Sequence, residues 1–197
     1  MAQNPITRRD ILKTLAIGAA GGSVLQAVPL QAAQHVHRMI TQEKSHAGTY
    51  RPKFFSAHQY QTLSSLCDAI IPPDEHSAGA VKAGAPEFID LLTSENQDYQ
   101  LALGGGMMWL DGLCADRFAS TYLACSPVQK TQVLDLIAYR KNADKDPALS
   151  QGVEFFAFLR RLTSDGFYSS EIGIKDLQYI GNTFLKEFPG CPAIPEG

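Results

Sequence analysis

The chain carries the same helix-start signature twice, in SAHQ at residues 56–59 and SPVQ at residues 126–129. In this capping box the serine side chain accepts a hydrogen bond from a free N–H of the first turn, and the glutamine side chain accepts from the serine backbone. Apolar residues follow each box at helical spacing. Pro72-Pro73 ends the first of these segments because proline cannot donate. Each box therefore predicts the start of a helix.

The rest of the body also shows helical periodicity and no strand-like alternation. Further helices are predicted at residues 86–93, about 98–122 and 153–162. The glycines 104–106 are expected to break or kink the second of these helices. The sequence from Thr163 onward is rich in glycine and tyrosine and ends in GCPAIPEG. The predicted fold is a compact all-α domain with long ordered loops and an irregular C-terminal arm.

The N-terminal residues TRRDILK are followed by a moderately apolar stretch rich in glycine and alanine, which is typical of a secretion signal. The segment resembles a twin-arginine export signal, whose usual form is Ser/Thr-Arg-Arg-x-Phe-Leu-Lys. The matching residues are Arg8, Arg9, Leu12 and Lys13, and Ile11 stands where phenylalanine is commonest. This resemblance implies translocation in the folded state and a periplasmic location.

These features divide the chain into a signal segment (1–33), a polar linker (34–53) and a single helical domain (54–197). Ala32 and Ala33 are small enough for signal cleavage, but Leu30 and Gln31 occupy positions where another small residue is preferred. An uncleaved signal that anchors the protein in the membrane is therefore an alternative.

The charge balance disfavours nucleic-acid binding. The net charge is −3, and without the four charged residues of the signal the chain has 14 basic and 19 acidic residues. A protein that tracks phosphates instead presents a basic face.

Sequence motifs for catalysis or cofactor binding are absent. The chain has no strand-associated dinucleotide fingerprint, no C-x-x-C-H, no H-E-x-x-H and no G-x-S-x-G. Asp74-Glu75-His76 is the best candidate for a metal or acid–base cluster, and the alternative is a solvated, capped turn. We predict no catalytic, cofactor-binding or metal-binding residue in this chain.

Four cysteines, Cys67, Cys114, Cys125 and Cys191, allow three connectivities if all of them pair. Cys67 lies on the apolar stripe of its helix and is expected to be a buried thiol. Cys114 and Cys125 are 11 residues apart, so they can form a disulfide only if the chain turns between them. They are the candidate disulfide.

Aromatic residues near the C-terminal arm suit a docking surface, although each could instead belong to the core. The candidate partner interface consists of Trp109, Phe167, Tyr168, Ile172, Tyr179 and Phe184.

Taken together, these segments resemble the gluconate 2-dehydrogenase subunit 3 family. The matching blocks are Phe54–Leu92, Gly104–Phe118, Ser126–Lys141, Phe155–Asn182 and the GCP at Gly190–Pro192. The most specific parts are DAIIP-D in the first block and GFY-S-IGI-DL-YIGN in the fourth. The resemblance covers nearly the whole chain after the predicted signal.

The resemblance implies a non-catalytic small subunit. It would bind, stabilise and escort through twin-arginine export a large FAD-dependent dehydrogenase of the glucose–methanol–choline type, acting on gluconate, glucose or a glycoside. FAD is expected in that partner and no cofactor in this chain, and a cytochrome c subunit is a further implied partner. The alternatives are a membrane-anchored structural subunit and a stand-alone metal-dependent enzyme using residues 74–76.

Overall fold

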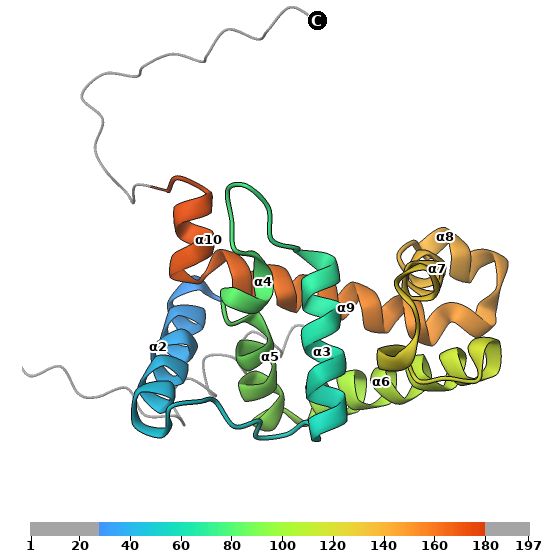
Figure 1. Ribbon diagram of the computed structural model, residues 1–197, viewed down its shortest axis with the longest axis horizontal. Helices are drawn as coiled ribbons and strands as arrows, with labels where there is room; N and C mark the ends of the chain where they lie inside the picture. The colour runs from blue at the N-terminus through green and yellow to red at the C-terminus, as the bar shows by residue number, and fades with distance from the viewer. Residues whose placement is uncertain (1–27, 180–197) are drawn as a thin grey trace, which may run out of the picture.

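The computed structural model describes residues 28–179, which are entirely helix and loop (Figure 1). The α-helices are α2 (Leu30–Ala47), α3 (Ala57–Ile70), α4 (Gly79–Lys82), α5 (Ala85–Ser94), α6 (Gln97–Phe118), α7 (Pro127–Ile137), α8 (Arg140–Lys145), α9 (Ser150–Tyr168) and α10 (Glu171–Asp176). Two 3₁₀-helices, η1 (Tyr122–Ala124) and η2 (Pro147–Leu149), connect neighbouring helices. The all-α prediction is confirmed, and both predicted capping boxes form, at α3 and α7.

Helix α9 is the central element of the structure. It runs along the molecule from α10 at one end to α7 and α8 at the other, with α5 and α6 packed against it (Figure 1). Its buried side chains join those of the surrounding helices in one apolar core. Burial of that apolar surface is the main favourable contribution to the stability of this fold.

Helices α6 and α9 approach closely because each places an aromatic ring over a glycine of the other. A methyl group at Gly106 of α6 would lie 2.0 Å from Phe155 Cδ2 of α9. Reciprocally, a methyl group at Gly152 of α9 would lie 2.2 Å from Trp109 Cζ3 of α6. Both separations are far shorter than a van der Waals contact, so only glycine fits at these two positions.

The glycines 104–106 do not break α6, contrary to the sequence-based expectation, since the helix is continuous from Gln97 to Phe118. It ends where Ala119 adopts a left-handed conformation (φ 52°), four residues earlier than the predicted end of the helix near residue 122. Close packing against Phe155 compensates for the low helix propensity of Gly106.

A buried carboxylate organises the loop before α3. Asp90 lies inside α5 with 0% exposure, and it accepts hydrogen bonds from the Tyr50 hydroxyl at 2.7 Å and from three consecutive backbone N–H groups. These backbone donors are Lys53 at 2.6 Å, Phe54 at 3.2 Å and Phe55 at 3.0 Å. Asp90 therefore fixes the path along which the chain enters the capping box of α3.

The prediction of a polar linker over residues 34–53 is wrong for most of its length, because residues up to Ala47 belong to α2. Ala33, Val36 and Ile40 of α2 are buried, and α2 packs against α5 (Figure 1). His37 stacks on Phe88 of α5 with ring centroids 5.2 Å apart. The many polar residues of this segment lie on the outer face of a docked helix.

The boundary predicted for the signal segment, at residue 33, also extends too far. Val28, Ala32 and Ala33 are buried, and the Val28 N–H donates to Asp165 Oδ2 of α9 at 3.2 Å. Residues 28–33 are therefore part of the folded body. Residues 1–27, which include the predicted export residues, lie outside the described range.

The irregular arm predicted to start at Thr163 begins later in the structure. Thr163 is fully buried within α9, and its hydroxyl donates to the Leu159 carbonyl at 2.9 Å. After α9 the chain forms α10, whose N-cap Ser170 accepts a hydrogen bond from Gly173 N–H at 3.0 Å. The sequence from residue 180 onward lies outside the described range.

Two alanine substitutions in α6 should change stability in opposite directions. Gly106→Ala forces a methyl group into Phe155, and we expect it to lower the free energy of unfolding by about 1–3 kcal/mol. Gly112→Ala is the matched control, because nothing lies within 4 Å of that position. It should raise stability by about 0.5–1 kcal/mol through helix propensity. Urea denaturation of the purified chain measures both values, and a shift in the same direction would contradict the packing described for Gly106.

The docking of α2 should weaken in mild acid. Burial lowers the pKa of His37 below its usual 6.5, partly opposed by its hydrogen bond to the Gly166 backbone and by Glu87. The unfolded chain therefore binds a proton near pH 6.5 that the folded chain resists, so the free energy of unfolding should fall as the pH drops below that value.

This dependence is measured by denaturation between about pH 7.5 and 5. His37→Gln should show a shallower fall in stability than the wild type. His46→Gln, which changes an exposed histidine at the end of the same helix, should follow the wild type. Equal slopes for the wild type and His37→Gln would show that His37 does not carry the effect.

Candidate partner interface

Helix α6 is apolar on the side that faces solvent as well as on the side that faces the core. Leu103, Met107 and Leu110 are buried, whereas Leu101 and Met108 are 70% and 69% exposed. A surface helix of an isolated domain normally has a polar outer face, and a helix that is apolar all round is normally covered on all sides. The outer side of α6 is therefore the strongest candidate for a surface that another molecule covers.

We call this surface the α6 face and define it as Leu101, Gly105, Met108 and Gly112, which follow one another at intervals of four, three and four residues. The fold does not require either glycine. Both have negative φ, a methyl group at Gly112 would contact nothing within 4 Å, and one at Gly105 would lie 3.8 Å from Gln151 Nε2. Each glycine costs about 1 kcal/mol relative to alanine in a helix interior. Because these glycines have no side chain, the backbone of another chain could approach the backbone of α6 closely at these positions.

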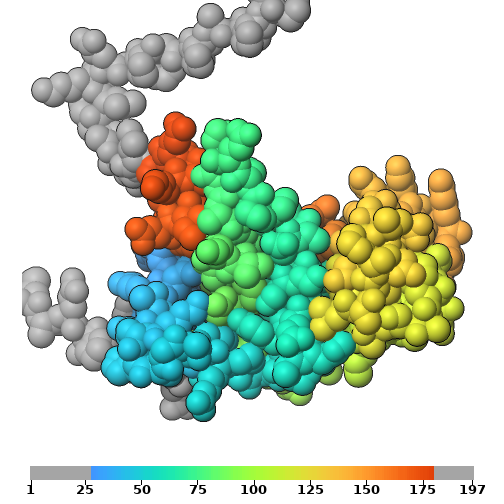
Figure 2. All heavy atoms as spheres, viewed as in Figure 1, coloured from blue at the N-terminus to red at the C-terminus, as the bar shows by residue number. Residues whose placement is uncertain are grey.

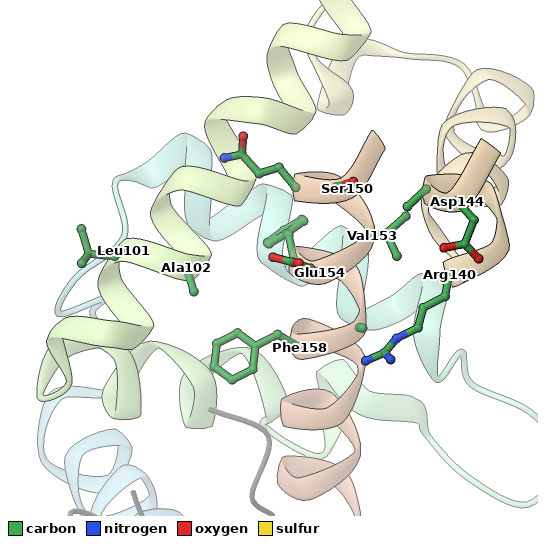
Figure 3. A pocket seen from close by; sticks show the side chains of 12 residues that line it. Leu101, Ala102, Arg140, Asp144, Ser150, Val153, Glu154 and Phe158 are labelled. Carbon is green, nitrogen blue, oxygen red and sulfur yellow. The ribbon is translucent and has the colours of Figure 1, made fainter. Parts of the chain in front are cut away.

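A groove of about 690 Å³ continues the α6 face across α9 (Figure 3). Leu101, Ala102 and Phe158 lie on one side of α9 in this groove, and Arg140 and Asp144 of α8 lie on the other. Gln151 and Glu154 of α9 also line the groove, which therefore combines apolar side chains next to the α6 face with charged ones on α8 and α9. Protein–protein interfaces also combine apolar and polar surface.

Figure 2 shows that the C-terminal part of α6, with α7 and α8, forms one end of the molecule, and that α2 and α10 form the other. The end formed by α2 and α10 carries a second exposed apolar group, in which Tyr168, Leu177 and Tyr179 are 43%, 57% and 52% exposed.

The structure does not bring the sequence-predicted interface residues into one surface. Phe167 is 1% exposed and belongs to the core, so the prediction is wrong for this residue. Trp109 is half-buried with its ring against Gly152, and its part in an interface stays a prediction. Ile172 is half-buried against the core. Tyr168 and Tyr179 are exposed as expected, and Phe184 lies outside the described residues.

The α6 face was missed because helical periodicity identifies the buried side of a helix and gives no reason to single out the other. The available signal was the lack of polar residues between Leu101 and Leu110. An amphipathic surface helix of that length would show a polar stripe.

Residues 74–76 form a capped turn in the exposed loop between α3 and α4. Asp74 Oδ1 accepts hydrogen bonds from Ser77 N–H at 2.7 Å and from His76 N–H at 2.8 Å, and these lower the pKa of the Asp74 carboxyl. The turn alternative is confirmed. Among residues 28–179, no three His, Cys, Asp or Glu side chains are grouped so as to hold a metal ion.

The cysteines of the described range are free thiols. Cys67 is buried as predicted, and its sulfur lies 3.6 Å from the Thr163 hydroxyl. Cys114 and Cys125, the candidate disulfide, are also free thiols in the structure, and both are buried where η1 packs against α6.

No helix within residues 28–179 is both long enough and apolar enough to cross a membrane.

An exposed apolar helix face, as the described residues show on α6, is typical of an interaction surface. The family model described as gluconate 2-dehydrogenase subunit 3 matches residues 57–190. The chain belongs to this family, as the sequence resemblance predicted. Its family is thus that of an accessory subunit of a dehydrogenase complex. Comparisons with curated proteins and with solved structures gave no match.

Proposed function

We propose that this chain binds and stabilises a large FAD-dependent sugar dehydrogenase subunit and escorts it through twin-arginine export. The observation that carries the binding role is the α6 face, an apolar surface on a helix whose opposite side is already buried. Family membership supports the proposed class of partner, and the resemblance of TRRDILK to a twin-arginine signal supports the proposed export role.

The cofactor of the proposed partner explains why one subunit would carry the export signal and the other the catalytic chemistry. A flavoprotein must fold around its FAD before it crosses the membrane, and the twin-arginine route carries folded proteins. A small subunit that carries the export signal can direct both itself and the flavoprotein to the translocase, provided that the two remain bound during transport. Stable binding of this kind normally buries on the order of 2,000 Å² or more of mostly apolar surface.

In this proposal the catalytic chemistry belongs to the partner. FAD and the sugar substrate bind there, and a cytochrome c subunit accepts the electrons. The substrate is gluconate, glucose or a glycoside. The role of this chain's own residues is to provide the α6 face and the adjoining groove as a docking surface.

A charge on the α6 face should weaken the complex. Met108→Glu places a carboxylate at the middle of the face, where binding would remove it from water without a partner. We expect the dissociation constant for the flavoprotein to rise about tenfold or more, which corresponds to about 1.4 kcal/mol or more. The measurement is a binding titration of the purified flavoprotein against each variant, followed by flavin absorbance of the recovered complex.

Val128→Glu is the matched control, because Val128 is 67% exposed on α7 and lies outside the α6 face. Both side chains are exposed, so neither change should alter the stability of the isolated chain by more than about 0.5 kcal/mol. Equal binding by Met108→Glu and the wild type would place the interface elsewhere. A wild-type chain that captures no flavoprotein at all would refute the binding role.

The export role is tested independently by replacing Arg8 and Arg9 with lysine. Because the twin-arginine receptor reads the arginine pair as an address, we expect both this chain and its flavoprotein to stay in the cytoplasm. The readout is the distribution of both proteins and of dehydrogenase activity between cytoplasm and periplasm. Export of the flavoprotein at the wild-type level would refute the escort role while leaving the binding role intact.

A further inference from the structure

The packing of η1 against α6 brings Cys125 back toward Cys114, although ten residues lie between them in sequence. Cys114 is on the last turns of α6. The left-handed Ala119 ends that helix and reverses the chain, and η1 then returns Cys125 to the side of α6. Both side chains are buried, with Cys114 0% and Cys125 6% exposed. This is the turn between the two cysteines that a disulfide requires.

The return of η1 is fixed by groups other than the sulfurs. The Tyr122 N–H donates to Asp111 Oδ1 at 2.9 Å, and the second carboxylate oxygen of Asp111 bonds to His58 Nε2 of α3 at 2.7 Å. Tyr122 is 1% exposed, and Lys130 of α7 lies over its ring at 5.2 Å. Asp111 is one helical turn before Cys114, so it holds η1 beside the part of α6 that carries Cys114.

Cys67 provides the contrast within the same chain. It is equally buried, but its neighbour is the Thr163 hydroxyl at 3.6 Å. Cys125, in contrast, follows a segment that Asp111 ties to the part of α6 carrying Cys114. The placement therefore singles out one of the possible pairings.

We propose that Cys114 and Cys125 form an intramolecular disulfide when the chain meets an oxidising thiol–disulfide pool, and that this bond clamps η1 to the end of α6. The expectation that the chain meets such a pool in the cell rests on the proposed export. The expectation that Cys114 and Cys125 can form the bond does not depend on export.

The reaction is a two-step exchange with a disulfide oxidant, either a protein dithiol–disulfide catalyst or oxidised glutathione. The thiolate of Cys125, the more exposed of the two, attacks one sulfur of the oxidant, forms a mixed disulfide and releases the first oxidant thiolate. The thiolate of Cys114 then attacks the Cys125 sulfur and releases the second. The two cysteines lose two electrons and two protons, and the oxidant is recovered as two thiols.

Burial makes this closure slow in the folded chain. It is the main cause that raises the pKa of the Cys114 thiol to about 12, so little thiolate is present at neutral pH. Exchange should therefore proceed through local opening of η1, and its rate should rise with pH.

The bond is expected to stabilise the end of α6. It closes a short loop in the unfolded chain, which reduces the entropy of that state. For a chain of this size the oxidised form should melt roughly 5–10 °C higher than the reduced form.

The test uses the reduced, purified full-length chain equilibrated with oxidised glutathione. The chain is then unfolded in acid, alkylated and analysed by mass spectrometry. We expect loss of two alkylatable thiols out of four and one cross-linked peptide that joins Cys114 to Cys125. Cys67→Ser should behave like the wild type in closing this bond, whereas Cys125→Ser should form no such peptide and show no rise in melting temperature.

Peptide mapping of the wild type decides the question even if a variant folds poorly. Four alkylatable thiols at equilibrium, or a cross-link that uses Cys67 or Cys191 in place of Cys114 or Cys125, would overturn the pairing.

A second arm compares protein recovered from the periplasm with the Arg8→Lys/Arg9→Lys variant retained in the cytoplasm. A disulfide in the first and free thiols in the second would support both the pairing and export. Closure in glutathione together with free thiols in exported protein would overturn the claim that the cellular pool oxidises the pair, while the pairing itself would stand.

Discussion

The close crossing of α6 and α9 is the constraint on which the other contacts depend. Phe155 sits over Gly106, and Trp109 sits over Gly152, so neither helix can shift along the other without a steric clash. Helix α5 packs on α9 by the same device, since a methyl group at Gly166 would lie 2.9 Å from Phe88 Cδ1. Because α9 runs the length of the molecule, these contacts set the positions of helices at both ends. They also orient α6 so that its remaining apolar side must face outward.

This orientation connects the fold with the proposed function. If α6 rotated to bury Leu101 and Met108, it would lose the packing of Gly106 against Phe155. The protein therefore exposes apolar surface as a consequence of its core. In an accessory subunit such exposure is useful, because the surface is formed before the partner arrives and requires little reordering on binding.

Local sequence signals predicted most of the helices but not the contacts between helices that are far apart in the sequence. The boxes at 56–59 and 126–129 are satisfied within four residues, so the sequence alone identified the starts of α3 and α7. Helix α2 was missed because its polar residues outnumber its buried ones, and its stability comes from contacts with α5 and with the C-terminal cap of α9. The α6 glycines illustrate the same limit, since only the position of Phe155 distinguishes Gly106 from Gly112. The candidate interface followed from the structure for this reason, whereas the family followed from sequence blocks.

The hydrogen bonds of Asp90 have a practical meaning for anyone who expresses this protein. The family match begins at residue 57, but all four donors to Asp90 come from residues 50–55. A recombinant chain cut to the matched range would keep the buried carboxylate inside α5 and lose every one of these donors. It would also lose the helix that covers α5. The residue range matched by the family model is thus shorter than the range whose contacts hold the fold together. Truncation designs should retain the chain from Val28 onward.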